Sequence, residues 1–441
     1  MRACAALAPT ESEPRRAGPT MSARAPLLEL GRLAADLAQP EDVTGALAQP
    51  LSLNQLQQAL SHEGNLERLR CFMRKLANGA NVTLAAVGGS ITAGGSSSVA
   101  RDLSGTYHMK VYRWLQRRYP QAHIRHATAA IPSVFHEDYM EHCLSMHVPQ
   151  SADLVLLDTP ANLCDKCVEG HCNTCNVALS AIELMLRTLL DLPRRPAVVF
   201  VNFFMFWDLH GPKAWKRSDT GKGLRLKTAM NLSFHRQFGH GRHEHMLDEL
   251  AKYYAAPSVS LRDVIFHDVQ TTSHFNGVHV RSLYHDQIHP SARGQTIMAQ
   301  ATLHLLKRAA LLSAVHPPSR CGLEAPQLPQ PMLADRTRQR MLCLNAHSLR
   351  KLPGDCSWAI SIADSRRGKG AGMHYLSGDR EGDSCQVGLA VLPEDGSGQT
   401  SARYVGIAYK ASMKSEMGLA RVECPARNCA CEPLELDARA S

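Results

Sequence analysis

Three features are scarce or absent in the sequence. No run approaches the roughly 18 consecutive apolar residues that a membrane-spanning helix needs, so we expect no transmembrane segment. Aromatic residues make up only 5% of the chain, and no basic stripe with interleaved aromatic side chains occurs, which argues against a nucleic-acid partner. The first 30 residues contain no apolar stretch of signal-peptide length. We therefore expect a soluble globular protein.

Charge and cysteine content point to the compartment. The 441 residues carry a net charge of +9, scattered along the chain rather than gathered in one patch. Of the 14 cysteines, seven lie between Cys321 and Cys431, a density that favours disulfides in an oxidising compartment. Two glycosylation sequons, at Asn81 and Asn231, fit the same compartment. We expect a secreted protein or one in the endomembrane lumen, although no clear signal peptide is visible.

Short apolar runs alternate with helical patterns in the middle of the chain. Because strands that alternate with helices form parallel sheets through right-handed crossovers, the pattern predicts a doubly wound α/β fold with five parallel strands, of the flavodoxin-like type. The expected strands cover residues 82–88, 123–127, 153–158, 197–204 and 257–261. The expected helices cover residues 51–79, 107–119, 176–190, 243–255 and 291–312, the last with Ser291 as its N-cap.

Composition divides the chain into four parts. Residues 1–50 are rich in Ala, Pro and Arg and read as a disordered leader, and residues 51–312 form the α/β domain with its core at 80–310. Residues 313–335 are Pro-rich and predict an exposed linker that protease should cut between about residues 315 and 335. Residues 336–441 show short β-like runs and predict a smaller Cys-rich, β-sandwich-like domain that positions substrate.

Polar residues with catalytic chemistry follow the expected strands. Ser90 lies in "GGSITAGG" after the first strand, Asn162 in "DTPANLC" after the third, and Asp286 and His289 in "YHDQIHP" beyond the fifth. In a doubly wound sheet these loops meet at one edge, where ligands bind. An imidazole can take the proton of a serine hydroxyl, and a carboxylate can hold that imidazole in one tautomer. The motifs therefore predict a serine nucleophile with His289 as base and Asp286 as its partner.

Each motif also has a plainer interpretation. The glycine-rich turn could be only a tight turn or a phosphate cradle, and Asn162 could be only a turn residue. The C-x2-C-x4-C-x2-C array could form two disulfides, bind zinc or keep free thiols; its members are Cys164, Cys167, Cys172 and Cys175. A histidine-rich stretch at 235–245 could bind a metal ion but is more typical of a surface loop. A basic segment at 210–227 is typical of a surface loop and is also placed to cover a substrate.

At the serine, asparagine and Asp-His motifs the chain resembles the SGNH hydrolase family of GDSL-like esterases and lipases. "VGGSITAG" and "YHDQIHP" look closest to a plant and green-algal branch with a C-terminal β extension. The resemblance implies Ser90 as nucleophile, Asp286 and His289 as the rest of a triad, and an oxyanion hole from Ser90, Asn162 and Ser133. Three positions depart from the family: Gly89 replaces a common Asp, and Thr128 and Ser133 stand near the places where an Asn and a Gly are expected. A serine there keeps the backbone N–H donor.

The prediction from sequence is a serine esterase that hydrolyses an O-acyl ester, such as an acetylated polysaccharide, without a cofactor or metal. The same triad can transfer an acyl group to a glycan when water is excluded, so O-acyl transfer is an alternative. A third alternative is a catalytically degenerate glycan-binding protein, which the altered second block at Ser133 favours and the complete set of Ser90, Asp286 and His289 disfavours. The sequence leaves open the acyl substrate and the oligomeric state.

Overall fold

The structure is a computed structural model. It describes residues 31–35, 37, 50–95, 103–131, 141–160, 172–203, 215–217, 224–226, 242–272, 274–285, 289–318, 321, 327–333, 359–362, 374–377, 419–422 and 434–437.

A five-stranded parallel sheet forms the centre of the fold, and its strand order is β2-β1-β3-β4-β7. All four pairings are parallel and confirm the predicted doubly wound, flavodoxin-like α/β class. Each strand lies where an apolar run predicted it. The bounds are β1 (Asn81–Gly88), β2 (His123–Ala130), β3 (Leu154–Asp158), β4 (Ala197–Asn202) and β7 (Ser258–Ser260).

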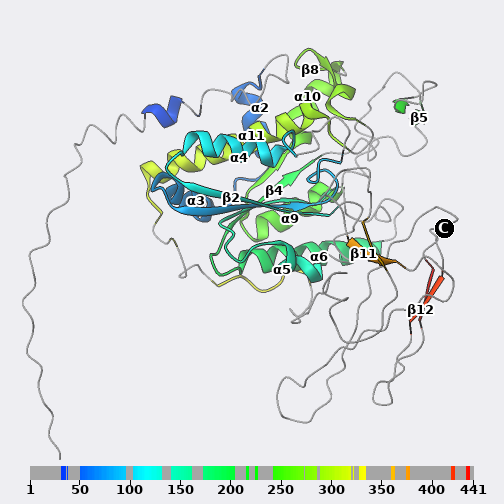
Figure 1. The fold of residues 1–441 in the computed structure, drawn as a ribbon. Helices are drawn as coiled ribbons and strands as arrows, with labels where there is room; N and C mark the ends of the chain where they lie inside the picture. Colours follow the sequence, from blue (N-terminus) through cyan, green and yellow to red (C-terminus); the bar gives the residue numbers. More distant parts are fainter. Residues whose placement is uncertain are drawn as a thin grey trace, which may run out of the picture.

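Helices cover both faces of this sheet (Figure 1). Five of them contribute to the core on one face: α2 (Leu53–Gln58), α3 (Glu67–Ala77), α4 (Tyr107–Arg118), α10 (Leu261–Thr272) and α11 (Ala292–Val315). Three cover the other face: α5 (Glu141–His147), α6 (Cys172–Leu190) and α9 (Arg242–Tyr253). With helices on both sides, β1, β3, β4 and β7 are buried on both faces, whereas the edge strand β2 is partly exposed.

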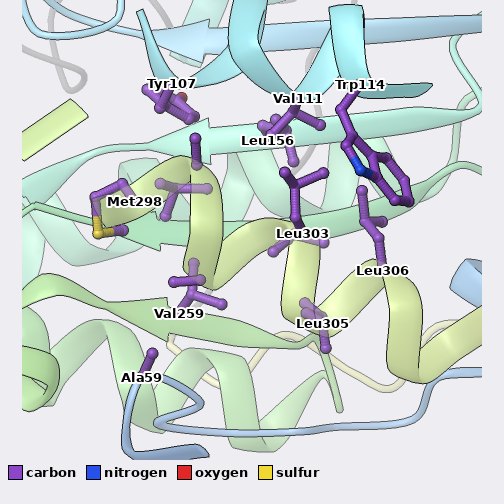
Figure 2. Close-up of a cluster of buried hydrophobic side chains, with 14 of the residues drawn as sticks. Ala59, Tyr107, Val111, Trp114, Leu156, Val259, Met298, Leu303, Leu305 and Leu306 are labelled. Atoms are coloured by element: carbon purple, nitrogen blue, oxygen red, sulfur yellow. The ribbon is translucent and has the colours of Figure 1, made fainter. Parts of the chain in front are cut away.

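The side chains of β4 show this division directly. Val199 and Val201 pack into the core under α11, whereas Val198 and Phe200 pack into the core under α6 and α9. All four are buried, which explains why the strand reads as a continuous apolar run rather than an alternating one. Figure 2 shows the first of these cores, with side chains of α11 gathered against those of α4.

The helix expected over residues 51–79 is two helices, so this prediction was wrong in one respect. α2 and α3 are separated by residues 59–66, in which His62 forms a bridge with Ser258 of β7. Gly64 causes the break: its φ is +64°, and a Cβ atom there would lie 2.5 Å from the carbonyl oxygen of Ala255. A positive φ cannot continue a right-handed helix, and only glycine fits so close to another backbone.

A segment of the expected linker is packed against the α/β domain. We call residues 327–333 the strap. Its Leu328, Met332 and Leu333 pack against the α6 and α9 core. The Glu183 carboxylate of α6 accepts hydrogen bonds from the backbone N–H groups of Met332 and Leu333, and Arg187 donates to the carbonyl oxygen of Pro329 at 2.6 Å. Residues 327–333 are therefore attached to the α/β domain by apolar side chains and a buried carboxylate, while residues 327 and 329–331 are exposed. The linker as a whole stays a prediction.

A disulfide fixes the chain just before the strap. Cys71 of α3 is bonded to Cys321, 250 residues away in sequence. Cys143 of α5 is also disulfide-bonded. These bonds agree with the oxidising compartment that cysteine density predicted.

The strap should resist proteolysis in the wild type. We expect chymotrypsin to spare the bonds after Met332 and Leu333, and to cut them about tenfold faster or more in Glu183→Ala, because two hydrogen bonds to a charged acceptor are lost. Mass mapping of timed digests measures this. Asp191→Ala, which removes a surface carboxylate paired with Arg195, is the control and should not change the rate. Equal cleavage of all three proteins would contradict the importance of Glu183.

Four further two-stranded antiparallel pairs occur among the described residues: β5 (Trp215–Arg217) with β6 (Leu224–Leu226), β8 (His274–Phe275) with β9 (Val278–His279), β10 (Ala359–Ile362) with β11 (His374–Ser377), and β12 (Leu419–Val422) with β13 (Leu434–Asp437). The last two pairs lie in the region expected to form a β domain. That domain and its boundaries stay a prediction.

Candidate active site

Ser90 and His289 meet at the carboxyl edge of the sheet. The serine follows β1 directly, and the histidine lies two residues before the N-cap of α11. The Ser90 Oγ atom is 2.8 Å from Nε2 of His289, although 199 residues separate the two in sequence. Both side chains are partly exposed, so a reactant could reach them. This is the geometry in which a serine hydroxyl can donate its proton to an imidazole.

A tight turn presents the serine. We call residues 89–95 the nucleophile turn. Within it, the N–H of Ala93 donates to the carbonyl oxygen of Gly89 at 3.0 Å, and the N–H of Gly95 donates to that of Ser90 at 2.6 Å. A Cβ atom at position 95 would lie 3.0 Å from the Ser90 Cβ and 3.1 Å from the His289 Cδ2. A glycine is needed there because the serine and the imidazole both lie against it.

Hydrogen bonds fix the segment that carries His289. The N–H of His285 donates to the carbonyl oxygen of His289 at 2.8 Å, and the N–H of Ser291 donates to that of Leu283 at 2.8 Å. The Ser291 hydroxyl donates to the carbonyl oxygen of Ser282 and accepts from the N–H of Arg293. Ser291 is thus the predicted N-cap of α11 and also closes the loop that places the imidazole.

A buried polar network lies behind the nucleophile turn. The Thr92 hydroxyl donates to Oδ2 of Asp158, the last residue of β3, at 2.8 Å and lies 3.3 Å from the Tyr107 hydroxyl. All three side chains are no more than 1% exposed. Burial raises the pKa of Asp158 to about 7, while the hydrogen bonds of Thr92 and the charge of His289 act in the opposite direction. Burial also raises the pKa of Tyr107.

Gln295 of α11 joins the turn to two helices. Its side chain accepts from the backbone N–H of Tyr107 at 2.9 Å and donates to the carbonyl oxygen of Ile91 at 3.3 Å. The side chain is 1% exposed. Because α11 also begins at the His289 segment, one helix sets the positions of both reacting groups.

Two histidines also support the nucleophile turn. Nε2 of His108 is 2.8 Å from the carbonyl oxygen of Thr92, and its Nδ1 is 3.0 Å from Nε2 of His126. A carbonyl only accepts, so His108 must donate from Nε2 and accept from His126 at Nδ1. Burial lowers the pKa of His108 to about 3, with His126 contributing, and burial lowers the pKa of His126 to about 4. Both imidazoles are therefore neutral near neutral pH.

This pair should make the fold sensitive to acid. Below pH 6.5 the unfolded chain binds protons on both imidazoles, whereas the folded protein does not until about pH 4 and 3. The contribution of this pair to stability therefore falls as the pH drops from 6.5, by about 3 kcal/mol for His108 at pH 4 at 1.36 kcal/mol per pKa unit. Urea unfolding between pH 7 and pH 4 measures this. His108→Gln, which can keep both hydrogen bonds without titrating, should flatten the dependence, and an unchanged dependence would contradict it.

The structure brings together two of the predicted site residues, Ser90 and His289. Asp286, Asn162 and Ser133 lie outside the described residues, as do the side chains of the Cys164–Cys175 array. Their roles stay predictions. Sequence reasoning missed the buried network behind the nucleophile turn, whose members are Thr92, Tyr107, His108, His126, Asp158 and Gln295. One signal pointed to it: Asp158 is a charged residue that ends an otherwise apolar strand.

Two further findings apply to the described part of the chain alone. No group of three or more His, Cys, Asp or Glu side chains is arranged there to hold a metal ion. No helix there is both long and apolar enough to cross a membrane.

The chain matches no family model and no curated protein. Among solved structures it is similar to a two-domain esterase active on acetylated mannans, with 19% identity, a TM-score of 0.45 and coverage of 63% of this chain and 60% of that one. It is also similar to an acetylxylan esterase of Geobacillus stearothermophilus, with 17% identity, a TM-score of 0.36 and coverage of 51% of this chain and 94% of that one. Likenesses this distant do not identify a function, so the function proposed below depends on the site.

Proposed function

We propose that the protein is a serine hydrolase of the SGNH type that cleaves O-acyl esters. The observation that carries the proposal is the 2.8 Å contact between Ser90 Oγ and His289 Nε2 at the carboxyl edge of a doubly wound sheet. A serine and an imidazole at this distance, both partly exposed and both held by backbone hydrogen bonds, have the arrangement of a nucleophile and its general base.

The reaction follows from the roles of these two groups. Ser90 Oγ attacks the ester carbonyl while its proton moves to Nε2 of His289, and the resulting imidazolium then protonates the leaving alcohol. Water deprotonated by the same imidazole hydrolyses the acyl-serine and releases the acid. In this scheme Asp286 orients the imidazole. The backbone N–H of Ser90, the Asn162 side chain and the backbone N–H of Ser133 stabilise the oxyanion, each donor contributing about 3 kcal/mol to the transition state.

The substrate class we propose is an acetylated polysaccharide, and the compartment is the secretory pathway or the extracellular space. The disulfide between Cys71 and Cys321 supports the compartment. Acyl transfer to a glycan is the second candidate, because the same Ser90–His289 pair forms the acyl-enzyme and only the acceptor differs. Supplying an acyl donor with a glycan acceptor and measuring acylated glycan against free acid by mass spectrometry separates the two reactions.

A fluorophosphonate probe tests the proposal without knowledge of the natural ester. The purified, folded protein should form one covalent adduct, and peptide mapping should place it on Ser90, because only a serine activated by a base reacts with this probe. Ser151, at the opposite end of β3, is an internal control and should remain unlabelled. Absence of an adduct on Ser90 in folded protein would support the degenerate glycan-binding alternative instead.

A further inference from the structure

Asp158 is buried behind the nucleophile turn, where burial of an ionisable group is unfavourable. Its side chain is 1% exposed, and among the described residues only one of its two carboxylate oxygens has a hydrogen-bond partner. Oδ2 accepts from the Thr92 hydroxyl at 2.8 Å, whereas Oδ1 has none. A carboxyl group left half satisfied in an apolar site costs stability, so its presence there calls for a functional explanation.

The position of Asp158 couples it to the nucleophile turn. Gly88, the last residue of β1, pairs with Asp158, and a Cβ atom on Gly88 would lie 2.4 Å from the Thr92 hydroxyl and 2.8 Å from the Asp158 carbonyl oxygen. The end of β1, the nucleophile turn and the end of β3 therefore pack without free space. Thr92 is two residues after Ser90, so a shift of the Asp158 carboxyl would move the nucleophile.

Asp158 also interacts electrostatically with His289, the proposed base. Among the described residues, the titratable groups that act on its carboxyl are Tyr107 of α4 and His289 of the segment before α11. Tyr107 is neutral at physiological pH because its pKa is raised. The charge of His289 lowers the pKa of Asp158, although less than the hydrogen bonds of Thr92 do and against the larger, opposite effect of burial.

We propose that Asp158 is a positioning residue for the Ser90–His289 pair, which anchors the nucleophile turn through Thr92 and whose negative charge stabilises the transition state in which His289 gains a proton. The inference rests on the function proposed above. In the step concerned, the O–H bond of Ser90 breaks, its proton forms a bond with Nε2 of His289, and the oxygen bonds to the substrate carbonyl carbon. Asp158 exchanges no proton in this step. Its carboxylate offsets the positive charge that appears on the imidazole.

Rates of Ser90 labelling by a fluorophosphonate, measured against pH, test the proposal. Asp158→Asn can keep the hydrogen bond from Thr92 but removes the charge, and we expect it to label about 10- to 100-fold more slowly at pH 8. On the acid side, the wild-type rate should rise more steeply than tenfold per pH unit because two groups, Asp158 and the base, must lose protons. The variant should rise only tenfold per unit.

Thr92 separates the anchoring role from the charge. Thr92→Val removes the hydroxyl and should slow labelling about tenfold while the steep pH dependence stays, and Thr92→Ser should restore the rate to within about twofold. Asp191→Asn is a surface carboxylate control and should match the wild type. Circular dichroism and thermal melting establish that each variant is folded. If Asp158→Asn does not fold, the two Thr92 variants still test the anchoring role. Equal labelling rates for Thr92→Val and Thr92→Ser would overturn that role.

Three other outcomes overturn the proposal in distinguishable ways. A wild-type protein that never labels at Ser90 overturns the proposed function and this inference together. If the wild type labels at Ser90, and Asp158→Asn labels at the same rate with an equally steep pH dependence, the inference alone is overturned. A slower variant with unchanged steepness would make Asp158 a structural support only and also overturns it.

Discussion

Ser90→Ala is expected to lower the turnover number for p-nitrophenyl acetate by a factor on the order of 10⁵ to 10⁶ while KM changes little. The hydroxyl removed is the group that lies 2.8 Å from Nε2 of His289 and forms the acyl-enzyme in the proposed reaction. The residual rate should match the background of the donors that remain around the oxyanion. His289→Ala should lose as much, because the serine and its base act as one unit and their losses do not add.

Two measurements secure this result. Circular dichroism should be unchanged in Ser90→Ala, since the side chain is partly exposed and only its hydroxyl is removed. Ser151→Ala is the matched control, because Ser151 lies before β3 at the opposite edge of the sheet and contacts Thr83 at 3.3 Å rather than the site. It should retain full activity. Substantial turnover by Ser90→Ala would remove the serine from the mechanism and sink the proposed function.

Much of the central fold was predictable because its physical causes are local. Four of the five strands, β1, β3, β4 and β7, are buried on both faces, so each appears as a short run of small or apolar residues between turns. The edge strand β2 is partly exposed, and the alternation of strands with helices dictates parallel pairing. Ser90 and His289 were predictable for a related reason. The carboxyl ends of parallel strands meet at one edge, so a serine after β1 and an imidazole beyond the last strand, β7, were expected at the same edge, and the two are in contact.

The rest depends on contacts that no local pattern encodes. Thr92 and Asp158 are 66 residues apart, and Tyr107 and Gln295 are 188 apart. Their hydrogen bonds follow from how the helices pack once the sheet has formed. Gly64 looked like one weak residue in a long helical pattern, yet its positive φ and its contact with Ala255 divide that pattern into two helices.

The contacts of the strap are a further case in which the local sequence pattern does not encode tertiary packing. A Pro-rich composition is typical of exposed linkers, and nothing near residues 327–333 in sequence indicates a binding surface. The surface is supplied by Glu183, which is 149 residues from Met332, and by the apolar core under α6 and α9. Leu328, Met332 and Leu333 are the apolar side chains that this surface partly buries.

Loss of the disulfide between Cys71 and Cys321 is the second large effect we expect. The bond closes a loop of 250 residues, and constraining so long a loop in the unfolded chain stabilises the fold by about 5 kcal/mol in the chain-entropy model. The double variant Cys71→Ala/Cys321→Ala should therefore unfold at a much lower urea concentration. Cys71 is a buried residue of α3, so alanine also removes some apolar contact.

The same variant should release the strap. Cys321 lies six residues before the strap. Without the bond, the contacts that hold the strap among the described residues are those of Glu183, Arg187, Tyr253 and its own apolar side chains. We expect chymotrypsin to cut after Leu333 faster in the double variant than in the wild type, and Glu183→Ala to increase the rate further. Two results would refute this: an unchanged urea midpoint, or free alkylation of Cys71 and Cys321 in native wild-type protein. The second would also indicate a reducing compartment, because an oxidised pair cannot react with the alkylating reagent.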